Sequence, residues 1–236
     1  TYGAHLTFVG TRRDQPFQRP PRHFPFPLPI CRNDRALTGL TPSPSVDDLK
    51  KELRRRAKAV RREAFEQGGA AASAAIAAHG IAFAGRKAPA VVSGFLGIGD
   101  EIDLTPLMVR LEGEGYRLAL PVMEGKGKPL LFRAWSPGEP LAETMWGIRE
   151  PLPEAETLDP DIVLGPLLAF DAKGYRLGYG GGFYDRTLAR LRTLKPIASI
   201  GIAFDEQRVD TVPHADYDER LDWILTPSGP LKCEAA

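Results

Sequence analysis

Cysteine is scarce in this sequence: its 236 residues include two, Cys31 and Cys233, one near each end. Two cysteines so placed form neither a metal-binding spacing nor a disulfide framework, which favours a reducing compartment. No apolar run approaches the roughly 18 residues needed to span a membrane. The first residues also lack the basic-then-apolar pattern of a signal peptide. We therefore expect a cytoplasmic protein with no membrane partner.

An excess of one charge is missing as well. Lys and Arg number 31 against 30 for Asp and Glu, a formal net charge of +1. A dedicated nucleic-acid-binding protein usually has a strong basic excess, so no nucleic-acid partner is expected. The 43% hydrophobic and 26% charged residues are those of an ordinary globular protein that can bury a core.

Residues 1–44 differ from the rest, because they are dense in proline and arginine and show no periodicity. Proline removes backbone donors and favours extended neighbours, so we expect this extension to be disordered. An extension or a misplaced start site is favoured over an organelle-targeting or interaction arm. The sequence then predicts one domain over residues 45–230 and a short tail, 231–236.

Within that domain, segments with helical and strand patterns alternate, which is typical of an α/β fold. Helices are expected at 45–67, 68–85, 102–115 and 184–194. Strands are expected at 89–96, 116–123, 130–135, 161–170, 197–204 and 221–226. The run at 161–170 is apolar on both faces, as in a covered parallel sheet. The prediction is a three-layer sandwich, with a mainly parallel central sheet flanked by helices.

A glycine-rich loop follows the expected strand 161–170 and precedes a helix. Gly178, Gly180, Gly181 and Gly182 fall within five positions, a density that costs more backbone entropy than a simple turn requires. Backbone N–H groups of such a loop and the positive end of a helix dipole both favour an anion. The loop matches neither the P-loop nor the dinucleotide fingerprint. We expect a phosphate site of another kind.

Charged residues outside the glycines are further candidates for the same site. Lys50 and Arg54, at i and i+4 on a basic helix, share a face and could reach one phosphate together. Asp185, in the first turn of the helix, could hold Mg²⁺ beside nucleotide phosphates, and one of Asp216, Asp218 and Asp222, just before a strand, could complete the metal shell. No Ser/His/Asp or Cys/His order stands out, which disfavours covalent nucleophilic catalysis.

The run RLGYGGGFYDR, preceded by DIVLGPLLAFDAKGY, resembles the signature of the 5-formyltetrahydrofolate cyclo-ligase family. The resemblance extends from Lys50 to about Pro227 and includes the DEID turn, the GIREP segment and the pattern of Pro213, Asp218 and Asp222. It implies a three-layer α/β enzyme, expected as a monomer, that uses ATP and Mg²⁺ to convert 5-formyltetrahydrofolate to 5,10-methenyltetrahydrofolate. ATP would phosphorylate the formyl oxygen, and N10 would then attack the activated carbon.

The resemblance also implies site residues, grouped here by role. Arg176 and Tyr184 would be catalytic. ATP would be bound by Lys50, Arg54, Arg176, Leu177, Gly178, Tyr179, Gly180, Gly181, Gly182, Phe183 and Tyr184. The folate would be bound by Ile98, Glu101, Asp103, Tyr179, Gly180, Gly181, Gly182 and Phe183, with Asp103 preferred to Glu101 for the acidic role. Mg²⁺ would be bound by Asp185 and Asp218.

Two departures from the family pattern stand near these residues. Tyr217 occupies the position before Asp218 where the family often has His, and Leu104 separates the DEID turn from Thr105. Two other functions stay open: a sugar-phosphate isomerase or CoA-transferase-like enzyme, which would turn over without ATP, and a non-catalytic nucleotide-binding module. The candidate metal pair argues against the second.

Overall fold

The computed structural model describes residues 43–144 and 148–234. The predicted extension at 1–44 therefore lies outside the described residues, apart from its last two positions. Within the described ranges, no helix is long and apolar enough to cross a membrane. The α-helices are α1 (Val46–His79), α2 (Thr105–Gly113) and α3 (Phe183–Leu194), with short 3-10 helices at Ala82–Ala84 and Asp205–Gln207.

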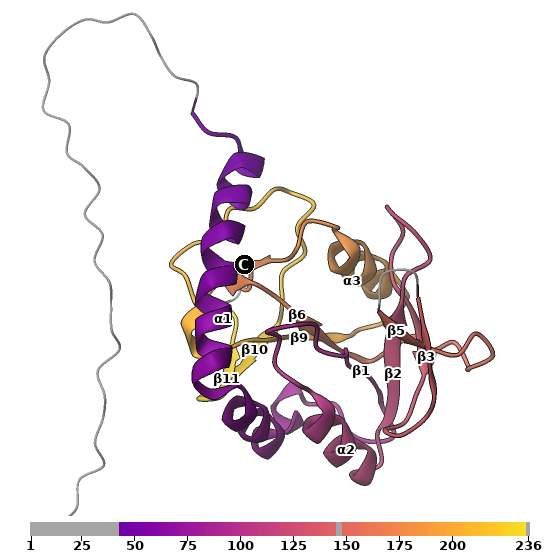
Figure 1. Ribbon diagram of the computed structural model, residues 1–236. Helices are drawn as coiled ribbons and strands as arrows, with labels where there is room; N and C mark the ends of the chain where they lie inside the picture. The colour runs from indigo at the N-terminus through magenta and orange to yellow at the C-terminus, as the bar shows by residue number, and fades with distance from the viewer. Residues whose placement is uncertain (1–42, 145–147, 235–236) are drawn as a thin grey trace, which may run out of the picture. The chain divides into compact units, whose positions relative to one another are not determined.

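A seven-stranded sheet organises these helices, in the order β11-β10-β9-β6-β1-β2-β3 (Figure 1). Its strands are β1 (Val91–Ser93), β2 (Arg117–Val122), β3 (Leu131–Ala134), β6 (Ile162–Pro166), β9 (Ala198–Ile202), β10 (Trp223–Thr226) and β11 (Gly229–Lys232). The inner neighbours pair in parallel, whereas β3 and β11 pair antiparallel at the two edges. The predicted α/β class with a mainly parallel sheet is confirmed.

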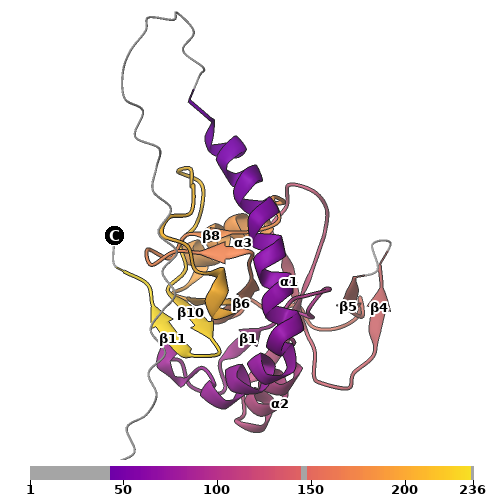
Figure 2. The ribbon, with the colours of Figure 1, turned by 60° about the vertical axis from the view of Figure 1, so that its left-hand side comes forward.

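The sheet is covered on both faces, because successive strand residues belong to different hydrophobic clusters. In β6, Leu164 packs in a cluster with residues of α1 and α2, whereas Val163 packs in a second cluster with residues of α3. Side chains of a strand alternate between the two faces of the sheet. The helices α1 and α2 therefore cover one face and α3 the other, and Figure 2 shows α2 beside the lower end of α1.

Helix α1 begins where its sequence predicts. Ser45 is the N-cap: its Oγ accepts the N–H of Asp48 at 3.1 Å, and the Asp48 carboxylate accepts the Ser45 N–H, which completes a capping box. The two helices expected at 45–67 and 68–85 form one element with a kink at Gly68, whose backbone is not helical. The helix ends at His79, before Gly80 at φ 62°.

Three segments differ from the predictions. The strand expected at 161–170 divides into β6 and β7 (Ala169–Phe170), and β7 forms a hairpin with β8 (Arg176–Leu177). Both pieces are buried, so the run resembles one apolar strand, although the Gly165-Pro166 dipeptide at the end of β6 marks the break. A second hairpin, β4 (Leu141–Glu143) with β5 (Arg149–Pro151), lies in a segment expected to be a loop. Strand β11 extends into the expected tail, where it pairs with β10.

Gly201, in the middle of β9, is required by packing. A Cβ at this position would approach side-chain atoms of Leu167, Leu221 and Ile224 at 2.6 to 2.9 Å. We predict that Gly201→Ala lowers the free energy of unfolding by roughly 1–3 kcal/mol, because overpacking forces neighbours out of place. Chemical denaturation measures the loss. Gly113→Ala is the control, with open space at its Cβ and an expected change within about 0.5 kcal/mol; equal effects would contradict the packing argument.

Candidate active site

A cavity of about 700 Å³ lies where the direction of chain progression in the sheet reverses. From β1 the chain continues to β2 on one side, whereas β6, on the other side of β1, leads on to β9 and β10. Ligands of open α/β sheets bind at such a point, beyond the carboxyl ends of the strands. The cavity is lined accordingly by the turn after β1, the ends of β2 and β6, the start of α1, the glycine-rich loop and residues 217–219.

The glycine-rich loop forms one wall of this cavity. Gly180 and Gly182 have φ values of 101° and 64°, a region that only glycine enters without strain. Gly182 also precedes α3 directly, and no side chain caps that helix. The first N–H groups of α3 therefore open toward the cavity, where the helix dipole favours an anion. On the other side of the loop, Arg54 Nε donates to the carbonyl of Gly178 at 2.9 Å.

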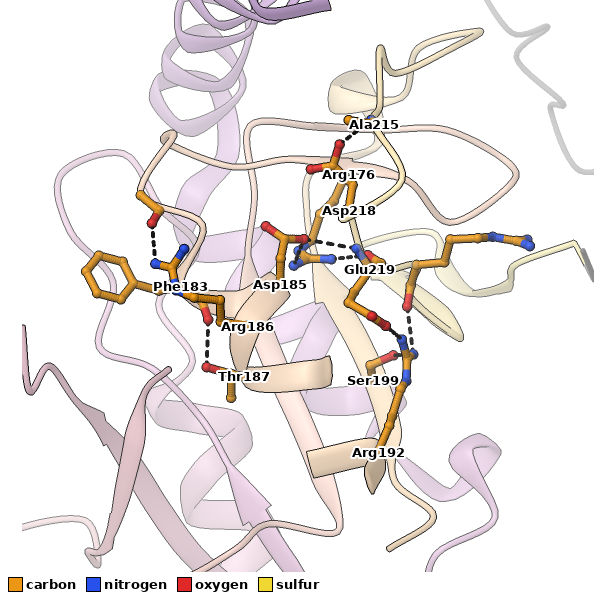
Figure 3. Close-up of polar contacts among 12 residues, drawn as sticks. Arg176, Phe183, Asp185, Arg186, Thr187, Arg192, Ser199, Ala215, Asp218 and Glu219 are labelled. Atoms are coloured by element: carbon orange, nitrogen blue, oxygen red, sulfur yellow. Dashed lines mark hydrogen bonds and ion pairs between the residues drawn. The ribbon is translucent and has the colours of Figure 1, made fainter. Parts of the chain in front are cut away.

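Several cations line the cavity, among them Lys50 and Arg54 from α1, Arg176 from β8, and Arg186, which donates to the Gly181 carbonyl of the loop at 2.6 Å. The side chain of Arg176 is 5% exposed, and its Nη2 lies 2.7 Å from Asp185 Oδ1. Figure 3 shows the two side chains pointing toward each other. Burial lowers the pKa of this guanidinium, and the charge of Asp185 opposes the shift. Lys50 is buried in the same way against Asp218, with Nζ 2.5 Å from Oδ2. These cations are held in place before any anion binds.

The two candidate metal ligands, Asp185 and Asp218, both line the cavity. Asp185 accepts from Arg176 and from the N–H of Glu219, and Asp218 accepts from the N–H of Ala215 (Figure 3). Asp218 also accepts from Lys50. In both carboxylates the other oxygen has no donor among the described residues. No group of three or more His, Cys, Asp or Glu side chains in residues 43–144 and 148–234 could hold a metal. The pair fits Mg²⁺, which takes one or two carboxylates together with phosphate oxygens and water.

The structure separates the acidic candidates of the DEID turn. Glu101 lines the cavity, is 7% exposed, and accepts the N–H of Ile98 at 2.9 Å. Asp103 lies outside the lining, and its Oδ1 accepts from the N–H and Oγ1 of Thr105 at 2.9 and 2.6 Å, at the start of α2. The structure therefore places Glu101, the second choice for the acidic role, at the cavity, whereas the Asp103 carboxylate is committed to the helix start; contact of either residue with folate stays a prediction. Ile98 lines the cavity as expected.

The aromatic residues of the loop also line the cavity. Burial raises the pKa of Tyr184 far above its ordinary value, and the nearby charge of Glu101 adds to the shift. Its phenol therefore stays protonated and can donate a hydrogen bond. The ring packs over β6 at Gly165, where a Cβ would come within 3.1 Å of it. Phe183 and Tyr179 complete this wall.

Several charged residues of this region were missed at the sequence level, Arg61 and Glu150 among them. Arg61 lies on the same face of α1 as Lys50 and Arg54, at i+11 and i+7, so helical periodicity could have identified it. Glu150, in β5, lines the cavity and accepts the N–H of Met123 at 3.0 Å. It stands in the GIREP segment that the resemblance had included as a whole.

The fold and the cavity together define an α/β enzyme, with its ligand site at the carboxyl ends of the central strands. The model of the 5-formyltetrahydrofolate cyclo-ligase family matches residues 46–227. The chain belongs to this family, and the resemblance found in its sequence is confirmed.

Individual relatives agree with this assignment. The 5-formyltetrahydrofolate cyclo-ligase of Escherichia coli (strain K12) is 36% identical over 142 residues, which cover 58% of this chain and 78% of that protein. The protein of the same name from Mycolicibacterium smegmatis is 33% identical over 155 residues, covering 63% and 77%. The solution structure of Aquifex aeolicus 5,10-methenyltetrahydrofolate synthetase is similar with a TM-score of 0.63 and 28% identity, over 80% of this chain and 94% of that one.

The pair of Lys50 and Asp218 yields a prediction about stability. We expect Asp218→Asn to lower the free energy of unfolding by about 1–3 kcal/mol, because a hydrogen bond between charged, shielded groups is lost. Asp159→Asn is the matched control, since its ion pair with Arg190 is exposed and contributes at most about 1 kcal/mol. Urea unfolding of both variants measures the difference. A smaller loss for Asp218→Asn than for Asp159→Asn would contradict the prediction.

Proposed function

We propose that this enzyme converts 5-formyltetrahydrofolate to 5,10-methenyltetrahydrofolate, with ATP consumed and ADP and phosphate released. One observation carries the proposal: a single cavity combines an anion-binding glycine-rich loop with an apolar wall that ends in a buried carboxylate. Phosphate binding alone would not require the apolar wall. A folate site alone would not require several cations beside the loop.

In the proposed reaction the terminal phosphoryl group of ATP passes to the formyl oxygen, and ADP leaves. N10 then attacks the formyl carbon and loses its proton, a C–N bond forms, and the former formyl oxygen departs with phosphate. The protein has to position the two substrates and neutralise phosphate charge, and no protein nucleophile is needed. We assign the neutralisation to Lys50, Arg54 and Arg176, together with the backbone N–H groups of the loop. The protonated Tyr184 phenol would donate a hydrogen bond to the transferring phosphoryl group.

Asp185 and Asp218 are proposed to hold Mg²⁺ through the carboxylate oxygens that have no donor among the described residues. The metal would neutralise phosphate charge during the transfer. The two residues serve in the protein itself as partners of Arg176 and Lys50, so they align these cations as well. The same two carboxylates would therefore both hold the metal and orient the two cations.

The folate is proposed to lie along the wall made by Phe95, Leu96, Ile98, Leu120 and Met123, which line the cavity. A flat heteroaromatic ring system buries apolar area there, and polar groups at the rim fix its orientation. Glu101 would provide one of these groups. The substrate is thus a small molecule, and we propose a monomeric enzyme that needs neither nucleic acid nor membrane.

The assay that tests this function follows the absorbance of the methenyl product. We predict product from 5-formyltetrahydrofolate only when ATP and Mg²⁺ are both present, and none after addition of a chelator in excess of the metal. Well-folded protein that forms no product under these conditions would overturn the proposal. The isomerase or transferase alternative predicts turnover without ATP, and the non-catalytic alternative predicts nucleotide binding without product.

A second prediction concerns the metal. Asp185→Asn should lower kcat at least about a hundredfold at a fixed Mg²⁺ concentration, since one charged ligand is lost. A series of Mg²⁺ concentrations measures the effect, and circular dichroism checks that Arg176, without its partner, leaves the fold intact. Asp216→Asn is the control, because this exposed carboxylate stands in the segment of Asp218 but does not line the cavity. Wild-type behaviour of Asp185→Asn across the series would refute the metal role.

A further inference from the structure

Arg61 is a buried cation next to the cavity that the proposed reaction does not use. It is 5% exposed, and its guanidinium pairs with the carboxylates of Asp100 and Glu101, the latter at 3.4 Å. Its Nη1 also donates to the hydroxyl of Tyr179. One side chain of α1 thus reaches both the turn after β1 and the glycine-rich loop. Arg61 itself does not line the cavity, so it can act on the site only through the residues that it contacts.

The hydroxyl of Tyr179 is fixed from two sides, since it accepts from Arg61 and donates to Glu101 Oε1. Burial, reinforced by the charge of Glu101, raises the pKa of this phenol, so the proton stays in place for the second bond. The residue as a whole is nevertheless 51% exposed, and it lines the cavity. Tyr179 therefore has an immobilised hydroxyl and an accessible ring.

Glu101 is fixed in the same way. Its Oε1 accepts from Arg61 and Tyr179, and its Oε2 accepts from the N–H of Ile98. The carboxylate thus lies between the backbone of its own turn and the buried guanidinium. Together, Arg61, Tyr179 and Glu101 connect three segments that are distant in sequence but meet at one wall of the cavity.

We propose that Arg61 is a positioning residue for the folate: it holds the Tyr179 ring as a flat face on which the pterin stacks, and it sets the Glu101 carboxylate beside that face. Aromatic stacking depends on the offset and tilt of the two rings, so a ring that could rotate freely would lose part of its binding free energy to ordering. Because the Tyr179 hydroxyl is hydrogen-bonded to two partners, the rotation of its ring is already restricted before the folate binds. The inference rests on the proposed function, because it needs a folate in the cavity.

A purely structural role explains the arrangement less well. Arg61 Nε is buried without a hydrogen-bond partner among the described residues. A network that served stability alone would satisfy this donor, since a buried unpaired N–H group is costly. The two remaining nitrogens of the guanidinium, by contrast, are committed to the groups that shape the cavity wall.

The test compares Arg61→Met, Arg61→Lys and Tyr179→Phe with the wild-type protein. Arg61→Met and Tyr179→Phe should each raise the KM for 5-formyltetrahydrofolate roughly tenfold or more, the loss expected for one charge-assisted hydrogen bond. The KM for ATP should stay within about twofold, because the phosphate contacts come from other residues. Arg61→Lys keeps the charge but loses the planar guanidinium, so its KM for the folate should lie between those of the wild-type protein and Arg61→Met. Arg62→Met is the control, since its ion pair with Glu66 is exposed.

A double-mutant cycle separates positioning from a general effect. If Arg61 acts through the Tyr179 hydroxyl, Arg61→Met combined with Tyr179→Phe should bind the folate little worse than either single variant. Additive effects, or a folded Arg61→Met protein with an unchanged KM for the folate, would overturn the inference. Should Arg61→Met not fold, Tyr179→Phe decides alone, because it leaves the guanidinium and both carboxylates paired. A wild-type protein that forms no methenyl product overturns the proposed function and this inference with it.

Discussion

The arrangement of the site depends on the burial of positive charge along one face of α1. Lys50, Arg54 and Arg61 all turn inward from this helix, and each meets an oxygen of a distant segment: Asp218, the Gly178 carbonyl, and the DEID turn with Tyr179. A buried cation without a partner is costly, so the helix can dock only where these oxygens are supplied. Lys50 and Arg54, which line the cavity, then remain available to an anionic ligand, whereas Arg61 lies behind the cavity wall.

This arrangement lets one cavity combine a positively charged wall with an apolar wall. The wall at the glycine-rich loop is made of backbone N–H groups and paired cations, whereas the opposite wall is apolar and carries two buried carboxylates, Glu101 and Glu150, each of which accepts a backbone N–H. Pre-organised charges need no reorganisation when a substrate binds, and they would stabilise the phosphoryl transfer that we propose. The sheet contributes by bringing the strand ends of both halves of the chain to one place.

Local patterns predicted most of this fold. The apolar strands, the capping box at Ser45 and the glycine density at 178–182 act over a few residues, so a sequence shows them directly. The preference for Asp103, which does not line the cavity, and the omission of Arg61 have another cause. Arg61 and Tyr179 are 118 positions apart, and nothing within either segment indicates their pairing. The break between β6 and β7 is marked in the sequence by Gly165 and Pro166, but the burial of both strands makes the run resemble one strand.

The first turns of α1 and the rest of the helix pack in different hydrophobic clusters. Ala64, before the kink at Gly68, and Ala72 and Ile76, beyond it, pack in the large cluster with α2, whereas Leu53 and Ala57 pack in a small cluster around β7 and β8. The part of the helix up to Ala57 can therefore open locally with less disruption of the main core. A bound polyanion would tighten that part alone, so occupancy of the cavity and order of the helix that closes it form a single equilibrium.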